Sequence, residues 1–371
     1  MQFQINSDFF YESLKNNNNL IKFNNIYPIL ENFLIIIENN KLKITSSDGD
    51  LYMYTNIIID NNNNFQCNFV INAKILINTL KTISDQNIFF KIYDKYIKIQ
   101  SLTSVYKISI SSGSEYPQLP NLDFNKFVNL NINEVKEIIN SILLTVAKDE
   151  LRPSMTGILL ETSHEYLNFV STDGHRLTKL TLKKGSVNNP RSFIIPIKLF
   201  NILKYQNKEE INNIDLFFND KFLQIKTSNN TIISKLIDEQ FPNYNAVIPS
   251  NNDKEIIINK SQILNALKRG FIYSDKINYQ INFKITKNCI KISSEDQNCL
   301  NTYNEILKCD YVKNDIIEIG FNVKYLIEMI NVIDDCNISI KISSNNNAVL
   351  LMPSIQKKDM TLIMIIMPLV L

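Results

Sequence analysis

The run Asp173-Gly174-His175-Arg176 holds the residue types that could carry out acid–base chemistry. A histidine acts as a general base when a carboxylate orients its ring, so Asp173 and His175 would suit a hydrolytic enzyme. His164 is the only other histidine, and the sequence has no G-x-S-x-G nucleophile motif and no carboxylates paired at metal-binding spacing. We therefore expect no catalytic residue, metal site or cofactor. A hydrolase stays an alternative that requires a deep polar cleft at this run.

The cysteines and glycines exclude other kinds of site. The five cysteines are an odd number and include no C-x-x-C pair. The ten-residue steps between Cys289, Cys299 and Cys309 match no zinc-binding spacing, so we expect reduced, buried thiols. Only 7 glycines are present, which argues against Gly-rich phosphate loops and most nucleotide-binding folds.

Composition predicts a folded protein of the cytoplasm. Hydrophobic residues make up 44% of the chain and charged residues 20%, enough apolar material for several cores. No run of about 18 uncharged apolar residues is present, so we expect no membrane span. The start of the chain lacks a basic region followed by an apolar one, which argues against secretion.

The turn at Asp173 is one of three copies of the same pattern, an alternating strand that runs into a polar turn. Asp48, Asp173 and Asp296 close the three copies and lie 125 and 123 positions apart. Three tripeptides that end in proline, at 115–117, 240–242 and 366–368, keep almost the same spacing. A period of this size is that of a small domain with its own core. We predict three tandem domains, at residues 1–122, 123–250 and 251–371.

Each third is expected to contain two helices and several strands. Val135, Ile138, Ile139, Ile142 and Leu143 have helical spacing, as do Leu326, Met329, Ile330 and Ile333. Weaker stripes of the same period include Phe10 and Leu14, Leu76 and Leu80, Leu199 and Leu203, and Leu264, Leu267 and Phe271. Alternating runs at 88–99, 106–110, 216–226, 231–237 and 338–342 indicate strands. This order predicts an α+β fold.

The exposed faces of the expected helices are basic. Lys74, Asn78 and Lys81 lie opposite an apolar stripe. A solvated helix face explains any single lysine, but recurrence in every repeat suits sequence-independent contact with the phosphates of a polyanion. Since the net charge is only +2, such a field must be confined to one face. Further basic residues on these helices are Lys136, Lys198, Lys204, Lys268, Arg269 and Lys324.

Several dispersed motifs resemble the bacterial DNA polymerase III beta subunit family, the replication sliding clamps. They occur in the family's order and cover the whole chain. They are Tyr27-Pro28-Ile29-Leu30, the run from Arg152 to Glu161, the run from Ser171 to Leu177, Phe241-Pro242-Asn243-Tyr244, the run from Glu318 to Asn322, and Met367-Pro368-Leu369-Val370-Leu371.

The resemblance implies three domains of one fold in each subunit and two subunits closed head to tail into a ring. A continuous sheet would lie outside, and twelve helices would surround a hole for duplex DNA. The implied function is to tether the replicative polymerase. The implied partners are double-stranded DNA, the polymerase III catalytic subunit, the clamp loader complex, other polymerases and repair proteins with clamp-binding motifs, and a second copy of the chain.

The resemblance also implies site residues. The segment around His175 would form one wall of a hydrophobic pocket for partner peptides, although plain core is an equal reading for Leu177 or Val247 alone. The pocket would comprise Met155, Thr172, Gly174, His175, Arg176, Leu177, Pro242, Val247, Asn322, Tyr325, Met367, Pro368 and Leu369. The residues facing DNA would be Lys22, Asn24, Lys74, Lys81, Lys136, Lys148, Arg152, Lys198 and Lys268. At the dimer interface, Tyr106 and Ile108 on an edge strand would oppose Ile272 and Tyr273.

Several positions depart from the family pattern. Val370 and Ala246 stand where arginines are common, which makes the pocket more apolar. Asn24 and Ala73 replace arginines on the DNA side, with lysines adjacent as substitutes. Loss of these arginines leaves open a second interpretation, a scaffold of the same fold that does not encircle DNA.

Overall fold

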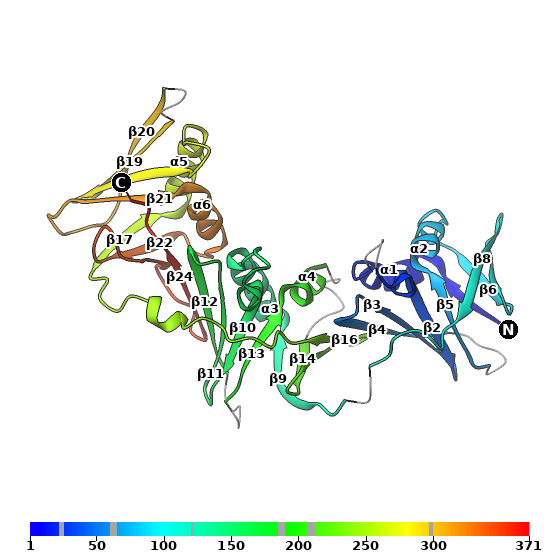
Figure 1. Cartoon of the computed structure of the whole chain (residues 1–371). Coiled ribbons are helices and arrows are strands. Elements are labelled where there is room, and N and C mark those ends of the chain that lie inside the picture. The colour runs from blue at the N-terminus through cyan, green and yellow to red at the C-terminus, as the bar shows by residue number, and fades with distance from the viewer. Residues whose placement is uncertain are drawn as a thin grey trace. The chain divides into compact units, whose positions relative to one another are not determined.

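The computed structural model describes residues 1–21, 26–59, 65–119, 122–184, 190–205, 213–296 and 300–370 (Figure 1). The chain forms two compact units. Unit 1 contains Met1–Val135 and Lys198–Leu236, and unit 2 contains Lys136–Ile197 and Ile237–Leu371. Both units share the middle third of the sequence, so the domain boundaries at 122 and 250 stay a prediction.

All six expected helices are present in the described part of the chain. Most begin directly after an asparagine whose side-chain oxygen accepts a backbone N–H of the first turn, as Asn6, Asn72, Asn259 and Asn322 do. Asn131 and Glu134 cap each other's backbone N–H groups reciprocally. The helices are α1 (Ser7–Asn18), α2 (Ala73–Lys81), α3 (Ile132–Ile142), α4 (Ile197–Tyr205), α5 (Lys260–Ile272) and α6 (Val323–Val332).

The predicted apolar stripe of α5 is correct for Leu267 but wrong for Leu264 and Phe271, which are only half-buried. The residues that α5 buries are Ile263, Ala266, Leu267 and Gly270. The small residues allow close packing, and a Cβ added to Gly270 would lie 2.6 Å from Cδ1 of Ile281. A prediction that followed only the large apolar residues therefore missed the packed face.

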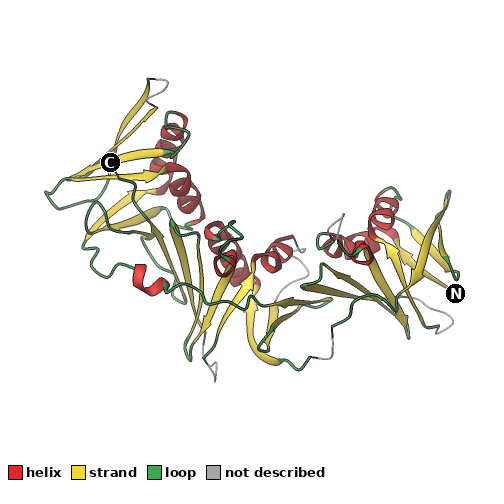
Figure 2. Ribbon diagram, in the orientation of Figure 1, coloured by secondary structure: helices red, strands yellow, loops and turns green. Residues whose placement is uncertain are grey.

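Unit 1 holds one antiparallel sheet of twelve strands. Helices α1 and α2 cover one face of its first half (Figure 2). Strand β4 pairs with β16, which joins strands from the first and middle thirds of the sequence. In sheet order the strands are β1 (Gln2–Asn6), β6 (Asn87–Ile92), β7 (Tyr96–Gln100), β8 (Val105–Ser112), β5 (Cys67–Asn72), β2 (Asn32–Glu38), β3 (Lys41–Ser47), β4 (Leu51–Ile58), β16 (Asn230–Lys235), β15 (Phe222–Lys226), β14 (Asn213–Phe218) and β9 (Asn125–Asn131).

Unit 2 holds an eight-stranded and a four-stranded antiparallel sheet. The first is ordered β13 (Ser192–Pro196), β10 (Gly157–Thr162), β11 (Tyr166–Thr172), β12 (Arg176–Lys183), β24 (Met360–Ile366), β23 (Val349–Pro353), β22 (Asn337–Ile342) and β17 (Lys254–Asn259). The second is ordered β20 (Asn301–Lys308), β19 (Cys289–Asp296), β18 (Gln280–Thr286) and β21 (Ile317–Asn322). The predicted runs 106–110 and 338–342 each fall on one strand and 231–237 extends two residues past β16, whereas 88–99 and 216–226 each cover two strands joined by a turn.

The repeated turn has the same hydrogen bonds in the first two copies. Asp48 Oδ1 accepts the N–H groups of Asp50 and Leu51, and Asp173 Oδ1 accepts those of His175 and Arg176. The glycine after each aspartate has a positive φ, 102° at residue 49 and 88° at residue 174, which a side chain disfavours. The Asp-Gly pair is therefore required by the backbone of the turn.

No helix among the described residues has the length and apolar character needed to cross a bilayer. The same residues contain no group of three histidine, cysteine or acidic side chains placed to hold a metal ion. Cys67, Cys289 and Cys309 are half-buried and Cys336 is exposed, all of them as free thiols, and Cys299 lies outside the described residues.

Candidate functional site

Arg176 is a buried charge of unit 2 that contacts several partners. Its side chain is 8% exposed and lies at the start of β12. Nε donates to Asp173 Oδ2 at 3.1 Å, and Nη2 donates to the carbonyl oxygen of Leu144 at 2.8 Å. Nη1 lies 2.6 Å from a Glu328 oxygen as an ion pair, without hydrogen-bond alignment. The guanidinium also lies 4.2 Å from the centroid of the Tyr325 ring. Arg176 thus connects β12 to helix α6.

Asp173 does not act as an orienting partner for a histidine base. One carboxylate oxygen accepts two backbone N–H groups, and the other accepts Arg176. The exposed ring of His175 lies instead beside the ring of Tyr325, with centroids 6.3 Å apart. This arrangement provides a turn and an aromatic surface, and it does not support the hydrolase alternative.

The segment that follows β24 is held against this turn by main-chain hydrogen bonds. Met367 donates its N–H to the carbonyl of His175 at 2.9 Å, and Leu369 donates to that of Gly320 at 2.8 Å. Met367 remains 44% exposed, while Pro368 and Leu369 are half-buried. Val370 is 90% exposed. The apolar segment therefore keeps side-chain surface available next to His175.

An apolar cluster lies under the start of β12. Leu177 is 3% exposed and packs in a buried cluster with Tyr244 and Ile365. Val247 is 49% exposed and Pro242 is also exposed, both on the segment that carries Tyr244. Leu177 is therefore core in the free chain, and the accessible apolar atoms belong to Val247, Pro242 and Met367.

Two more predicted residues border Gly174. A Cβ at Gly174 would lie 3.2 Å from Nη1 of Arg152 and 3.8 Å from Cε of Met155. Met155 is buried, and Thr172 bonds the turn by accepting the N–H of Gly174. A side chain at position 174 would crowd Arg152, which is a second reason for glycine there.

Asn322 positions Tyr325. The Asn322 side-chain oxygen accepts the N–H groups of Lys324 and Tyr325 at the start of α6. Burial raises the pKa of the Tyr325 hydroxyl, and the nearby Asp173 charge adds to the effect. Every residue predicted for the pocket lies in unit 2. Arg152 and Met155 lie close to Gly174. His175 and Arg176 both contact the ring of Tyr325.

Sequence reasoning missed two residues of this region, Glu328 and Tyr244. Glu328 follows Tyr325 by one helical turn on α6, a spacing that could have identified it. The Tyr244 hydroxyl donates to Glu161, and burial together with that bond raises the pKa of Tyr244. Tyr244 was part of the family motif that begins at Phe241, but nothing in the sequence indicated its partner Glu161.

The residues predicted to face DNA differ in their surroundings. Lys22 and Asn24 lie outside the described residues. Lys198 Nζ bonds Asp48 at 2.7 Å, and Arg152 bonds Asp149 at 3.1 Å. The remaining members, Lys74, Lys81, Lys148 and Lys268, are exposed, and Lys136 is half-buried. Lys74, Asn78 and Lys81 all lie on the exposed face of α2, as expected.

The dimer interface stays a prediction, but the expectation that Tyr106 and Ile108 form an exposed apolar edge is wrong. Ile108 is 4% exposed within a single chain and belongs to the core of unit 1, with Tyr106 packed against that core. The alternation of β8 turns both side chains inward, so they present no exposed apolar edge. Ile272 is 67% exposed at the end of α5, and Tyr273 is 39% exposed.

Family models match this chain in three successive stretches. They describe the N-terminal domain of the DNA polymerase III beta subunit at residues 1–120, its central domain at 129–243 and its C-terminal domain at 245–369. The chain belongs to the DNA polymerase III beta subunit family. Membership agrees with the three-fold repeat, because each model covers one copy.

Curated relatives of this beta subunit family cover nearly the same length. The "Beta sliding clamp" of Buchnera aphidicola is 27% identical over 358 residues, which is 94% of this chain and 97% of the relative. That of Haemophilus influenzae is 26% identical over 313 residues, 84% of each chain.

Solved structures of beta subunits share the fold. The DNA polymerase III subunit beta of Pseudomonas aeruginosa has a TM-score of 0.93 at 21% identity, with 100% of both chains covered. The sliding clamp of Bartonella birtlesii, solved with griselimycin bound, gives the same three values. The predicted α+β clamp fold of three repeated domains is confirmed.

Proposed function

We propose that this chain is a DNA sliding clamp, a non-catalytic ring subunit that encircles duplex DNA and tethers the replicative polymerase. The observation that carries the proposal is the succession of three beta-subunit domains along residues 1–120, 129–243 and 245–369. The names of the relatives favour a clamp over a scaffold that does not encircle DNA.

The ring would form from two copies joined head to tail, with Ile272 and Tyr273 of one copy against the β8 edge of the other. Within the part of the chain that the structure describes, residues 105–109 of β8 pair with β7 only, so one side of their main chain could accept a further strand. Since Tyr106 and Ile108 face the core, this interface rests on main-chain pairing and on the exposed Ile272.

Contact with DNA would use lysines on the helices. Lys74 and Lys81 on α2, Lys136 on α3, Lys198 on α4 and Lys268 on α5 recur in the repeats. Phosphate contacts of this kind are independent of base sequence and weaken with salt. Retention on DNA would come from encirclement, which needs little affinity.

The partner site would be the surface around His175 in unit 2. Val247, Pro242 and Met367 supply accessible apolar atoms, and Arg176 holds Tyr325 and the turn in place. We expect short apolar motifs of the polymerase III catalytic subunit, of the clamp loader complex and of other polymerases and repair proteins to bind there, in the cytoplasm. The griselimycin-bound clamps show that relatives bind a ligand.

Retention on circular DNA tests the proposal. The protein is loaded with a clamp loader complex onto nicked circles and washed in salt that abolishes direct binding. We expect it to stay on the circle and to leave when the circle is cut once. Loss from intact circles in the wash, or retention on the linear product, would contradict encirclement.

A further inference from the structure

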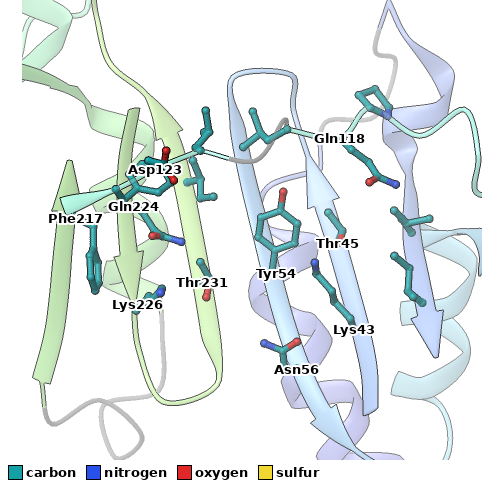
Figure 3. Close-up of a pocket in the computed structure, with 17 residues that line it drawn as sticks. Lys43, Thr45, Tyr54, Asn56, Gln118, Asp123, Phe217, Gln224, Lys226 and Thr231 are labelled. Carbon is teal, nitrogen blue, oxygen red and sulfur yellow. The ribbon is translucent and has the colours of Figure 1, made fainter. Parts of the chain in front are cut away.

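A groove of about 680 Å³ lies on the sheet of unit 1, whereas the residues of the peptide site belong to unit 2. Its floor is formed by β2, β3, β4, β16, β15 and β14, and residues 117–119 and 122–124 form a wall (Figure 3). Leu42 and Ile44 of β3 belong to the core with Phe10 and Leu14 of α1. Because strand side chains alternate, Lys43 lies on the sheet face opposite that helix.

The second copy of the repeat shows what this face of the sheet can hold. Positions on β2, β3 and β4 align with those on β10, β11 and β12 by a shift of 125, since Thr45 pairs with Tyr54 as Val170 pairs with Lys179. On β10–β12 the face is covered by Tyr244. Its ring lies 5.3 Å from Lys179 Nζ, its hydroxyl bonds Glu161, and it is 4% exposed.

The first copy lacks that cover. The positions equivalent to Tyr244, Lys179 and Glu161 are Leu119, Tyr54 and Ile36, and all three line the groove. A leucine cannot stack on a cation or reach a carboxylate as Tyr244 does. In unit 1 a leucine therefore stands where Tyr244 covers the face in unit 2, and the buried Tyr116 packs on another part of this face beside Leu34 and Ile36.

Two lysines lie in this groove. Lys43 Nζ is 4.5 Å from the centroid of the Tyr54 ring, and Lys226 Nζ is 4.8 Å from that of Phe217. Both lysines are exposed, and neither has a carboxylate partner in the part of the chain that the structure describes. Asp123 is the single acidic residue among the lining residues. The groove thus has positive charges that a carboxylate could neutralise.

The remaining lining residues indicate whether the groove suits a nucleic acid or an acidic peptide. Binding to nucleic acid depends on neutralising many phosphates, whereas the charges of Lys43 and Lys226 are partly offset by Asp123 in the groove and by Asp215 opposite Lys226 on β14. Apolar side chains such as Leu34, Ile233 and Phe124 also border the groove, and these suit the side chains of a peptide. The composition favours a peptide over a nucleic acid.

We propose that this groove is a second docking site, which binds a partner protein through an extended acidic segment with one aromatic residue. The aromatic side chain would occupy the place that Tyr244 fills in the second copy. Flanking carboxylates would pair with Lys43 and Lys226. The site is independent of the His175 surface, so one chain would hold two partners at once.

Peptide display tests the proposal. Random 12-residue peptides on phage are selected on the full-length protein and counter-selected on a Lys43→Glu/Lys226→Glu variant. We expect the enriched peptides to combine an aromatic with acidic residues, and synthetic copies to bind the variant at least tenfold more weakly. A Lys287→Glu/Lys291→Glu variant makes the same charge change at two exposed lysines of unit 2 and should bind normally.

A second variant introduces into the groove of unit 1 the residues equivalent to Tyr244 and Glu161. Ile36→Glu with Leu119→Tyr places a tyrosine and its carboxylate partner at the positions of Tyr244 and Glu161, and we expect it to reduce peptide binding at least tenfold. Enriched peptides that bind both groove variants normally would overturn the proposal, as would no enrichment. Oligothymidine binding that Lys43→Glu/Lys226→Glu abolishes, with no peptide enriched, would overturn it in favour of nucleic acid.

Discussion

The guanidinium of Arg176 lies 4.2 Å from the ring centroid of Tyr325 and thereby joins the middle and last repeats of the chain. The arginine comes from β12 and the tyrosine from α6, and an ion pair between Arg176 and Glu328 supports the contact. The nearly buried guanidinium of Arg176 thus holds the turn that carries His175 in place.

Replacing Arg176 with alanine should destabilise unit 2. The change leaves Asp173 without its cation and removes the contact with Tyr325, a loss of about 2 kcal/mol. We expect a lower melting temperature in scanning calorimetry. Lys291→Ala, at an exposed lysine, is the control and should melt like the wild type. An unchanged transition in Arg176→Ala would show that the contact contributes nothing.

Alanine variants of Lys198 and Lys268 should differ in melting temperature, but both should bind DNA more weakly than the wild type. The Asp48 side chain is 2% exposed, so Lys198→Ala leaves a buried carboxylate without this cation and should cost about 1 kcal/mol. Lys268→Ala should leave the melting temperature unchanged. Both variants should weaken binding to duplex DNA at low salt, measured by fluorescence anisotropy. Normal DNA binding by both would remove these lysines from the DNA-facing set.

The exposed apolar end of α5 predicts the assembly. We expect light scattering to give twice the 43.0 kDa of one chain for the wild type. Ile272→Ala with Tyr273→Ala should give the mass of one chain, because it removes the exposed side chains from the proposed interface. A wild-type protein of 43.0 kDa at micromolar concentration would contradict a dimeric ring.

Deleting Met367 to Leu371 should abolish binding of a polymerase-derived peptide. The deletion removes the hydrogen bonds to His175 and Gly320 and the accessible side chain of Met367. Calorimetric titration should show no binding, while light scattering should still show the dimer. Unchanged affinity in a folded, dimeric truncation would exclude the His175 surface as the site.

Thiol reactivity should follow burial. Burial raises the pKa of Cys67 and of Cys309 from 9.0 to about 11, so little of either thiol is ionised at pH 8. In a Cys289→Ser/Cys299→Ser/Cys336→Ser variant we expect slow reaction with Ellman's reagent at pH 8 and an increase in rate up to about pH 11. Because the folded-state pKa exceeds the ordinary value, the stability from these thiols is present below pH 9 and declines toward pH 11. A rate that levels off near pH 9 would contradict the burial.

Periodicity predicted the helices and strands because it reflects which side chains of an element are buried. The stripe from Val135 to Ile142 is buried as predicted, and 338–342 forms a strand, although Ser339 is buried as well as the isoleucines. Long-range partners were harder to predict. Nothing in the sequence around Lys198 indicates that it bonds Asp48, and the inward orientation of Ile108 depends on how β8 pairs with β5 and β7.

The site was predicted less completely than the fold. Family motifs gave the residues around His175, but the role of Arg176 depends on Glu328, which no motif contained. The proposal for the groove of unit 1 depends on the difference between Leu119 and Tyr244. That difference can be interpreted only from the contacts of Tyr244 with Glu161 and Lys179 in the structure. Sequence thus locates repeats, whereas the differences between them need the structure.

The pairing of β12 with β24 has a consequence for the order in which the protein folds. Arg176 lies opposite Ile366, and these partners are 190 residues apart in the sequence. On the ribosome, β12 must wait with an open edge until nearly all of the chain has been synthesised. We expect this edge to need protection during synthesis, and destabilised variants of β24 to aggregate through it rather than remain as soluble unfolded chains.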